Sequence, residues 1–419
     1  MLTAISNAFR VPELRRKIIF TLAMIALYRL GCFITVPGID AAKVLKLIQS
    51  NNALGLLGLF SGGALEKLAV FSLGIMPYIT SSIIMQLLQG VIPTVEKWAK
   101  EGESGQRKIT QITRYMTLGI ALLESIGLLA TFRTAMSATF SASQLLMTEA
   151  IIVITLIAGT AFIMWMGELI TQHGVGNGMS LLIFANIVAR FPDAIRQSIQ
   201  FGNGIFTGLL LIVVLFIIAA IVTMERAQRR IPVQYAKRVV GRRVYGGSGT
   251  YIPLKINGAN VVPIIFASAI LFFPSQIALM WPQAGWLQLG ASAISKGPVN
   301  WVLDFLLIVF FTYFYTALVF NPIDLSDNLR KNGGFIPGVR PGSATTRYIE
   351  NVLNRITLPG ALFLGVIAIA PAILFYWTNN QLIQSFGGTS ILIMVGVALE
   401  TMTQLESQLK MRHYEGFFK

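Results

Sequence analysis

The chain is poor in the residue types on which most catalytic and metal sites depend. Of its 419 residues only 12% are charged, two are histidine and one is cysteine, whereas 54% are hydrophobic. A single cysteine excludes an internal disulfide, and with two histidines no Cys/His zinc cluster can form. We also find no nucleophile with a base at a recognisable spacing. The sequence therefore predicts neither an enzyme nor a cofactor-binding protein.

The scarcity of charge leaves long apolar runs, which is the pattern of membrane-spanning helices because a bilayer core takes roughly 20 apolar residues per helix. Ten runs are candidates, of which the fifth is short and is supported mainly by the need for an even number of crossings between two basic termini. They cover residues 18–36, 68–91, 115–132, 150–166, 179–188, 205–224, 261–279, 302–320, 356–377 and 388–403. We predict an all-α integral membrane protein of about ten transmembrane helices.

The net charge of +15 is unevenly distributed along the chain. Lys and Arg gather at the two termini and in alternate connecting segments, above all in residues 225–255 and 321–355. Since basic loops stay in the cytoplasm, this distribution predicts that both termini are cytoplasmic. No small-residue cleavage site follows the first apolar run, so we expect that run to be a retained helix and not a removed signal peptide.

Two short motifs recur five helices apart. The first is Pro77-Tyr78-Ile79 with Ser82, repeated as Pro263-Ile264-Ile265 with Ser268; the second is the six residues from Gly178 to Ile183, repeated from Gly388 to Ile393. Ile, Leu and Gly are abundant in any membrane chain, so chance is the alternative. Because five is odd, a repeat of five helices is inverted in the membrane. We predict two inverted halves around a central pore, residues 1–188 and 205–419, joined by a hinge loop at 189–204.

Eight segments occur in an order and on loops that are specific when taken together. They are residues 36–40 (VPGID), 60–65 (FSGGAL), 74–79 (GIMPYI), 100–105 (KEGESG), 174–178 (GVGNG), 241–245 (GRRVY), 316–322 (TALVFNP) and 337–342 (PGVRPG). Through them essentially the whole chain resembles the SecY/Sec61-alpha family. The resemblance implies the channel of a Sec translocon in a bacterial inner membrane, which passes unfolded secretory proteins across the bilayer and releases membrane segments through a lateral gate.

The resemblance further implies that a ring of aliphatic side chains closes the pore at mid-membrane. Such a constriction makes physical sense, because it dewets and blocks ions while aliphatic side chains can part around a passing chain. Met179 replaces the commoner Ile, and its flexible thioether should preserve the seal. Ordinary helix packing is the alternative for each residue. Matching motif to motif places the ring at Ile75, Ile79, Met179, Ile183, Ile265 and Ile393.

Residues 54–65 are apolar but too short to span, which indicates a re-entrant segment or a loop helix. The resemblance implies a short plug helix under the ring, with plug residues Leu57, Leu59, Phe60, Ser61, Gly62 and Gly63. It also implies a lateral gate between the second and seventh helices, with Thr80, Glu124 and Phe273 at gate positions. A carboxylate inside a membrane helix is a functional candidate by default; for Glu124 the alternative is a hydrogen bond to a neighbouring helix.

The segments 225–255 and 321–355 are long enough to project from the membrane, which the positive-inside rule does not explain. The resemblance implies that they bind the translating ribosome and the ATPase SecA through Arg242, Arg243 and Arg340, and that SecE and SecG complete the complex. Guanidinium groups suit both RNA phosphates and protein carboxylates. The competing hypothesis is a secondary transporter built from inverted repeats. Such proteins place more mid-membrane charges than Arg29 and Glu124 supply here.

Overall fold

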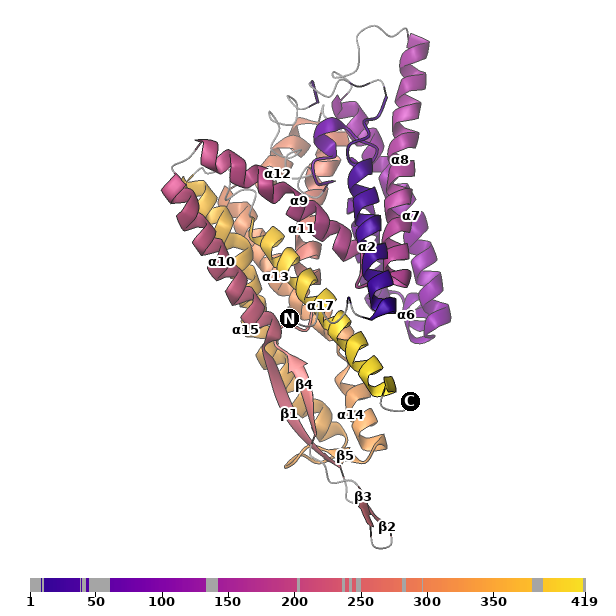
Figure 1. Cartoon of the computed structure of the whole chain (residues 1–419), viewed down its shortest axis with the longest axis vertical. Helices are drawn as coiled ribbons and strands as arrows, with labels where there is room; N and C mark the ends of the chain where they lie inside the picture. Colours follow the sequence, from indigo (N-terminus) through magenta and orange to yellow (C-terminus); the bar gives the residue numbers. More distant parts are fainter. Residues whose placement is uncertain are drawn as a thin grey trace.

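The computed structural model describes residues 9, 11–37, 39, 43–44, 61–132, 142–201, 204–235, 238–240, 243–245, 250–280, 284–295, 297–378 and 387–416. Each of the ten predicted spans coincides with a helix in this part of the chain, most of them running along the long axis of the molecule (Figure 1). These helices are α2 (Pro12–Gly31), α5 (Met76–Val91), α7 (Glu103–Phe132), α8 (Ala142–His173), α9 (Gly178–Phe201), α10 (Gly204–Arg226), α11 (Val262–Met280), α13 (Gly297–Val319), α15 (Ser343–Thr378) and α17 (Gly388–Gly416).

Two helices are shorter than their apolar runs. α2 ends at Gly31 although the run continues to residue 36, and Thr35 instead forms an isolated antiparallel bridge with Ala69. α5 begins at Met76 and not at residue 68, because the backbone at Leu68 has φ 40° and Pro77, which lacks an N–H, occupies the first turn of the helix. Apolar composition thus located both spans but not their outer ends.

The predicted hinge loop 189–204 is wrong in its structure, because most of it is helical. α9 continues through Pro192 as far as Phe201, and α10 begins at Gly204. Asp193 and Arg196 on this extension are exposed, as expected for turns that leave the apolar layer. The predicted span ended where charge begins, whereas a helix ends where its backbone hydrogen bonds end.

Shorter helices connect the spans. α6 (Pro93–Lys100) follows α5 after a bend of 100°, with Ile92 extended and Pro93 at the start of the new helix. α12 (Gly285–Ser295) packs between α11 and α13, and α14 (Pro322–Lys331) is capped by Asn321, whose side chain accepts a hydrogen bond from the backbone of Ile323. An Asn cap satisfies one of the free N–H groups of a helix start.

Two small antiparallel sheets, which the sequence did not suggest, lie at the lower end of the molecule (Figure 1). One has the order β4 (Thr250–Lys255), β1 (Gln228–Tyr235), β5 (Gly334–Phe335), and the other pairs β2 (Arg238–Val240) with β3 (Arg243–Tyr245). Because β5 belongs to segment 321–355 and the other strands to 225–255, the first sheet joins the two long basic segments. A separate hydrophobic core supports it, made of Ile231, Val233, Leu254, Leu329, Ile336, Ile349 and Leu353.

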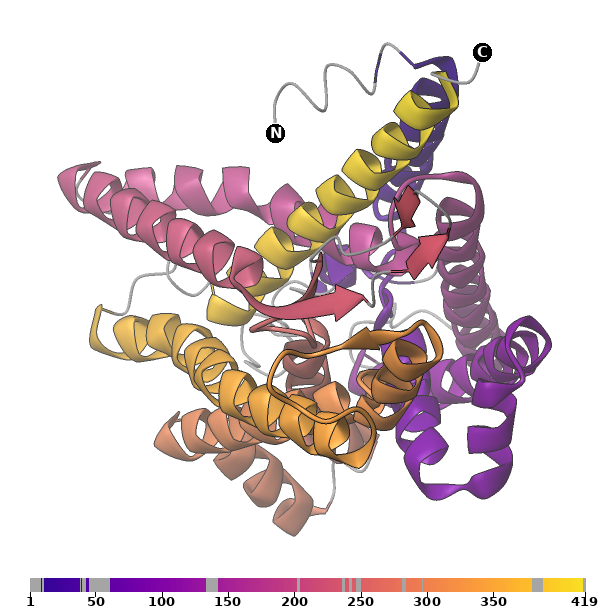
Figure 2. The same cartoon turned by 90° about the horizontal axis from the view of Figure 1, so that it is seen from below.

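The repeated motifs begin helices at equivalent positions in the two halves. Pro77 and Pro263 are each the second residue of their helices, α5 and α11, and Gly178 and Gly388 are each the first residue of α9 and α17. A Cβ on Gly178 would meet the backbone of α8, and one on Gly388 would meet the backbone of α15. The same close approach therefore starts the last helix of each half. Seen from the sheet end, the indigo and violet helices α2 and α7 lie across the molecule from the orange helix α15 (Figure 2).

Candidate pore, lateral gate and docking surface

The six predicted ring residues belong to the main hydrophobic core of the molecule, to which all ten long helices contribute. Ile75, Ile79, Ile183 and Ile393 are at most 8% exposed, and the half-buried Ile265 packs against the same cluster. α5 contacts α11, α11 contacts α17, and α17 contacts α9. Residues that are far apart in the sequence thus lie in the same apolar core, and the ring itself stays a prediction.

Met179 has a second contact that the sequence did not reveal. Its sulfur lies where a Cβ on Gly167 of α8 would be, so only glycine at that position leaves room for the thioether. Met179 is 8% exposed. Its side chain therefore packs against a neighbouring helix.

The predicted plug is only partly described, since Leu57, Leu59 and Phe60 lie outside the described residues. Ser61 is 2% exposed, and its Oγ accepts a hydrogen bond from the backbone of Leu65 at 3.3 Å. Gly62 has φ +61°, and a Cβ there would meet the side chains of Asn186 and Arg29. Gly62 is thus fitted closely between α2 and α9, at a position that requires glycine, whereas a Cβ on Gly63 would meet nothing within 4 Å.

The predicted gate residues lie on helices that pack together. α5, which carries Thr80, contacts α11, which carries Phe273, and α7, which carries Glu124, packs against both. Thr80 donates its hydroxyl to the carbonyl of Met76 in its own helix at 3.0 Å, and Phe273 is 47% exposed. Glu124 is half-buried. The structure thus brings together the three helices of the predicted gate.

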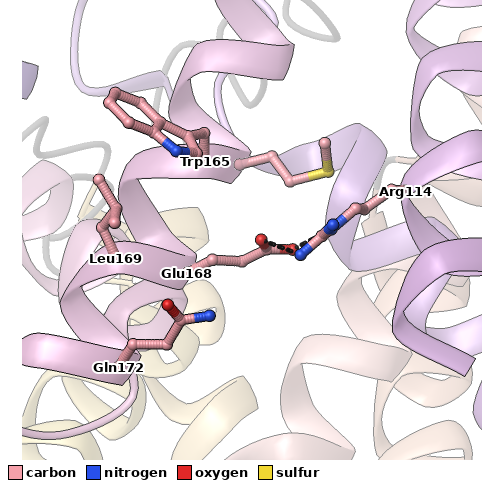
Figure 3. A pocket seen from close by; sticks show the side chains of 6 residues that line it. Arg114, Trp165, Glu168, Leu169 and Gln172 are labelled. Carbon is pink, nitrogen blue, oxygen red and sulfur yellow. Dashed lines mark hydrogen bonds and ion pairs between the residues drawn. The ribbon is translucent and has the colours of Figure 1, made fainter. Parts of the chain in front are cut away.

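An ion pair between α7 and α8 was missed by sequence reasoning. Arg114 donates from Nε and Nη2 to the two carboxylate oxygens of Glu168, at 2.7 and 2.5 Å, and Trp165 and Gln172 help to line a cavity of about 430 Å³ beside the pair (Figure 3). Such two-pronged, charge-assisted hydrogen bonds are stronger than neutral ones. The sequence did contain a signal for this pair, since Arg114 and Glu168 are opposite charges at the ends of two neighbouring predicted spans. The pair joins α8 to the helix that packs on both gate helices.

A second polar contact missed by the sequence ties the end of α10 to the start of α11. Asn257 donates from Nδ2 to Glu225 Oε1 at 2.6 Å and to the carbonyl of Asn260 at 2.9 Å. Burial raises the pKa of the Glu225 carboxyl, an effect opposed by the Asn257 hydrogen bond and by Lys255. The contact fixes the turn between β4 and α11, the helix that the second half contributes to the predicted gate.

Two of the three predicted docking arginines, Arg243 and Arg340, lie on or beside the sheet-bearing end. Arg340 is exposed, and the turn that holds it is fixed because its carbonyl accepts a hydrogen bond from Thr345 Oγ1 at 2.9 Å. Arg243 is in β3, where it pairs with Val240 of β2 in the hairpin at the lower tip of the molecule (Figure 1). Arg242 lies outside the described residues.

These features define a multi-pass helical membrane protein of the channel type, with an apolar centre and a basic, sheet-bearing projection at one end. The chain matches the SecY family over residues 69–402. It is 48% identical to the protein translocase subunit SecY of Streptomyces galbus over 437 residues, and 45% identical to that of Mycobacterium tuberculosis over 441 residues, with the whole of both chains covered in each case. The chain belongs to the SecY family.

Solved structures show the same fold at low sequence identity. One described as the structure of a protein conducting channel has a TM-score of 0.64 at 17% identity, and Sec61 in the canine ribosome-channel complex has 0.58 at 16%; 96% of each chain is covered in both. A further structure, with a TM-score of 0.64, concerns a SecY plug domain that stabilises the closed state of the channel. These likenesses confirm the fold.

Proposed function

We propose that this chain is the protein-conducting channel of a Sec translocon. It passes unfolded secretory proteins across the membrane and releases membrane segments sideways between α5 and α11. The observation that carries this function is family membership over the full length at 48% identity. The apolar surroundings of the proposed ring residues support it, because a channel for unfolded chains needs a seal without a binding site.

In the proposed mechanism the ring residues hold the resting pore dry. Water leaves an apolar constriction, so ions are blocked without any charged gate. When a signal sequence separates α5 from α11, the aliphatic side chains part and close around the moving chain. The plug, proposed at residues 54–65, moves aside at the same time. Arg114 and Glu168 keep α7 and α8 together while the gate helices separate.

The projecting end is proposed as the docking surface for the ribosome and for SecA, through Arg242, Arg243 and Arg340. Its support is physical: one sheet with its own core joins the two basic segments, and Arg340 follows Val339, which packs on that core. SecE and SecG are the proposed small membrane subunits. The sheet end is proposed to face the cytoplasm of a bacterium, with both termini on that side of the inner membrane.

Reconstitution tests the function against the transporter alternative. Vesicles that contain the protein with SecE, SecG and SecA should translocate a secretory precursor when ATP is added, and should leak few ions at rest. Vesicles that contain the protein alone should concentrate no small solute. Accumulation of a solute against its gradient by the protein alone would replace the channel by a transporter.

A further inference from the structure

Charged side chains from α2 and α9 converge on residues 61–67, the segment that leads from the proposed plug toward α5. Arg29 of α2 donates from Nη1 to the carbonyl oxygen of Gly62 at 3.0 Å. Arg190 of α9 donates from Nη2 to Glu66 Oε1 at 2.6 Å. The segment is therefore held from two sides by two guanidinium groups. Arg29 is in the last turn of α2, and this end of the helix lies away from the sheets (Figure 1).

The segment so held is internally braced. Ser72 donates its hydroxyl to the carbonyl of Ala64 at 3.1 Å, Leu65 and Leu68 are at most 2% exposed, and Ala69 bridges to the strand-like residues after α2. Apolar burial thus fixes its inner side. The two arginines supply polar contacts at Gly62 and Glu66, where the segment turns toward the proposed plug.

Arg190 lies on the face of α9 that also carries the proposed ring. Met179, Ile183, Asn186 and Arg190 follow one another at intervals of four, three and four residues, which places them on one side of a helix. Asn186 donates from Nδ2 to the hydroxyl of Tyr28 in α2 at 2.7 Å. The same face of α9 therefore carries first the proposed ring residues, then the contact of Asn186 with α2, and finally the contact of Arg190 with Glu66.

The Glu66–Arg190 pair has the exposure of a contact that can open. The Arg190 side chain is 22% exposed and that of Glu66 is 40% exposed. Water reaches Glu66 more than Arg190, so separation of the pair frees the Glu66 carboxylate into water but leaves the Arg190 guanidinium partly desolvated. A contact of this kind biases a closed state and does not lock it.

We propose that Arg29 and Arg190 are positioning residues that form a latch: they hold residues 61–67 in the closed channel and release them when a chain entering the ring displaces α9. The latch rests on the proposed function, since it requires a plug at 54–65. The latch couples opening of the ring to release of residues 61–67. The coupling arises because Ile183 and Arg190 lie on the same face of one helix, so a displacement of Ile183 also moves Arg190.

The principal test uses Glu66→Gln, which removes the charge at a partly exposed site while keeping the size of the side chain. The complex with SecE and SecG is placed in planar bilayers for resting conductance, and with SecA in vesicles for translocation of a precursor with a weakened signal sequence. We expect both readouts to rise about two- to fivefold, the range that a partly exposed ion pair contributes to an equilibrium. Arg190→Gln should have the same effect, and the two together no more than either alone.

Rescue separates the latch from a general loss of structure. Glu66→Arg combined with Arg190→Glu restores an opposite-charge pair and should return both readouts toward the unmodified protein. Glu103→Gln breaks the exposed ion pair with Arg107 at 2.7 Å on α7 and serves as the matched control, with no change expected. Unchanged conductance and translocation in Glu66→Gln and Arg190→Gln, beside an active unmodified complex, would overturn the latch alone. An inactive unmodified complex would overturn the proposed function instead.

Discussion

Placing serine at both Ile79 and Ile265 should make the resting channel leak ions. Transfer of one such aliphatic side chain out of water is favourable by about 1.5–3 kcal/mol. Two replacements therefore favour the water-filled constriction over the dry one by about 3 kcal/mol, if the lower value is taken for each. This is roughly a hundredfold change in the equilibrium constant between the two states. Ile79 is 8% exposed and Ile265 is half-buried, so both have apolar neighbours to lose.

The new hydroxyl groups need not be left without a hydrogen bond. Thr80 and Ser81, on the same helix, each donate to the carbonyl four residues earlier, at 3.0 and 2.8 Å. A serine at position 79 can do the same, so the substitution should wet the ring without adding an unsatisfied polar group. The folded, membrane-inserted amount should therefore change little.

Resting conductance across planar bilayers, measured on the complex with its small subunits, checks the prediction. Ile308→Ser on α13 is the matched control, because Ile308 is fully buried but is not one of the six proposed ring residues. We expect a smaller leak and a larger loss of thermal stability from that variant. If the double serine variant inserts normally and its conductance equals that of the unmodified protein, the two isoleucines are packing residues and the pore lies elsewhere.

Two further predictions concern the sheet end. Replacing Arg242, Arg243 or Arg340 by Glu should weaken co-sedimentation with ribosomes and binding of SecA. For the exposed Arg340 the inserted amount should not fall, since exposed substitutions usually change stability by no more than about 0.5 kcal/mol. Normal binding by all three variants would refute the docking surface. Burial raises the pKa of Glu225, so the folded state binds its proton more tightly than the unfolded state. That stabilisation is complete below the unfolded pKa and is lost as the pH rises through the folded pKa. The Tm of the unmodified protein should fall across this window more steeply than that of Glu225→Gln, and equal slopes would contradict the assignment.

The ten spans could be predicted because apolar length and charge counts are local properties of the sequence. The sheets could not be predicted in the same way. β1 contains Arg229, Arg230 and Pro232, which disfavour a strand, and only Ile231 and Val233 alternate inward. Its stability comes from β4 and β5 and from a core shared with helices α14 and α15, and those partners are distant in the sequence.

The residues of the candidate site could likewise be predicted only in part from the sequence. The ring positions came from the resemblance, while the residues alone supplied only the repeat that relates Ile79 to Ile265 and Ile183 to Ile393. The contacts of Arg190 with Glu66 and of Arg114 with Glu168 join positions 124 and 54 residues apart. Nothing in the local sequence selects these partners, because a charge near the end of a span can serve solubility, topology or pairing equally well.

The inverted repeat places a charged residue beyond the ring in each half. The offset of 210 that relates Ile183 to Ile393 also relates Arg190 of α9 to Glu400 of α17. Arg190 contacts Glu66 at the plug end, whereas Glu400 lines a cavity with Glu225 and Lys255 at the sheet end. Seven residues of helix are roughly 10 Å long, so charged groups approach the ring to about that distance along each helix. The apolar barrier between them is thinner than the roughly 30 Å of a bilayer core, and a translocating chain therefore leaves water over only a short stretch at any moment.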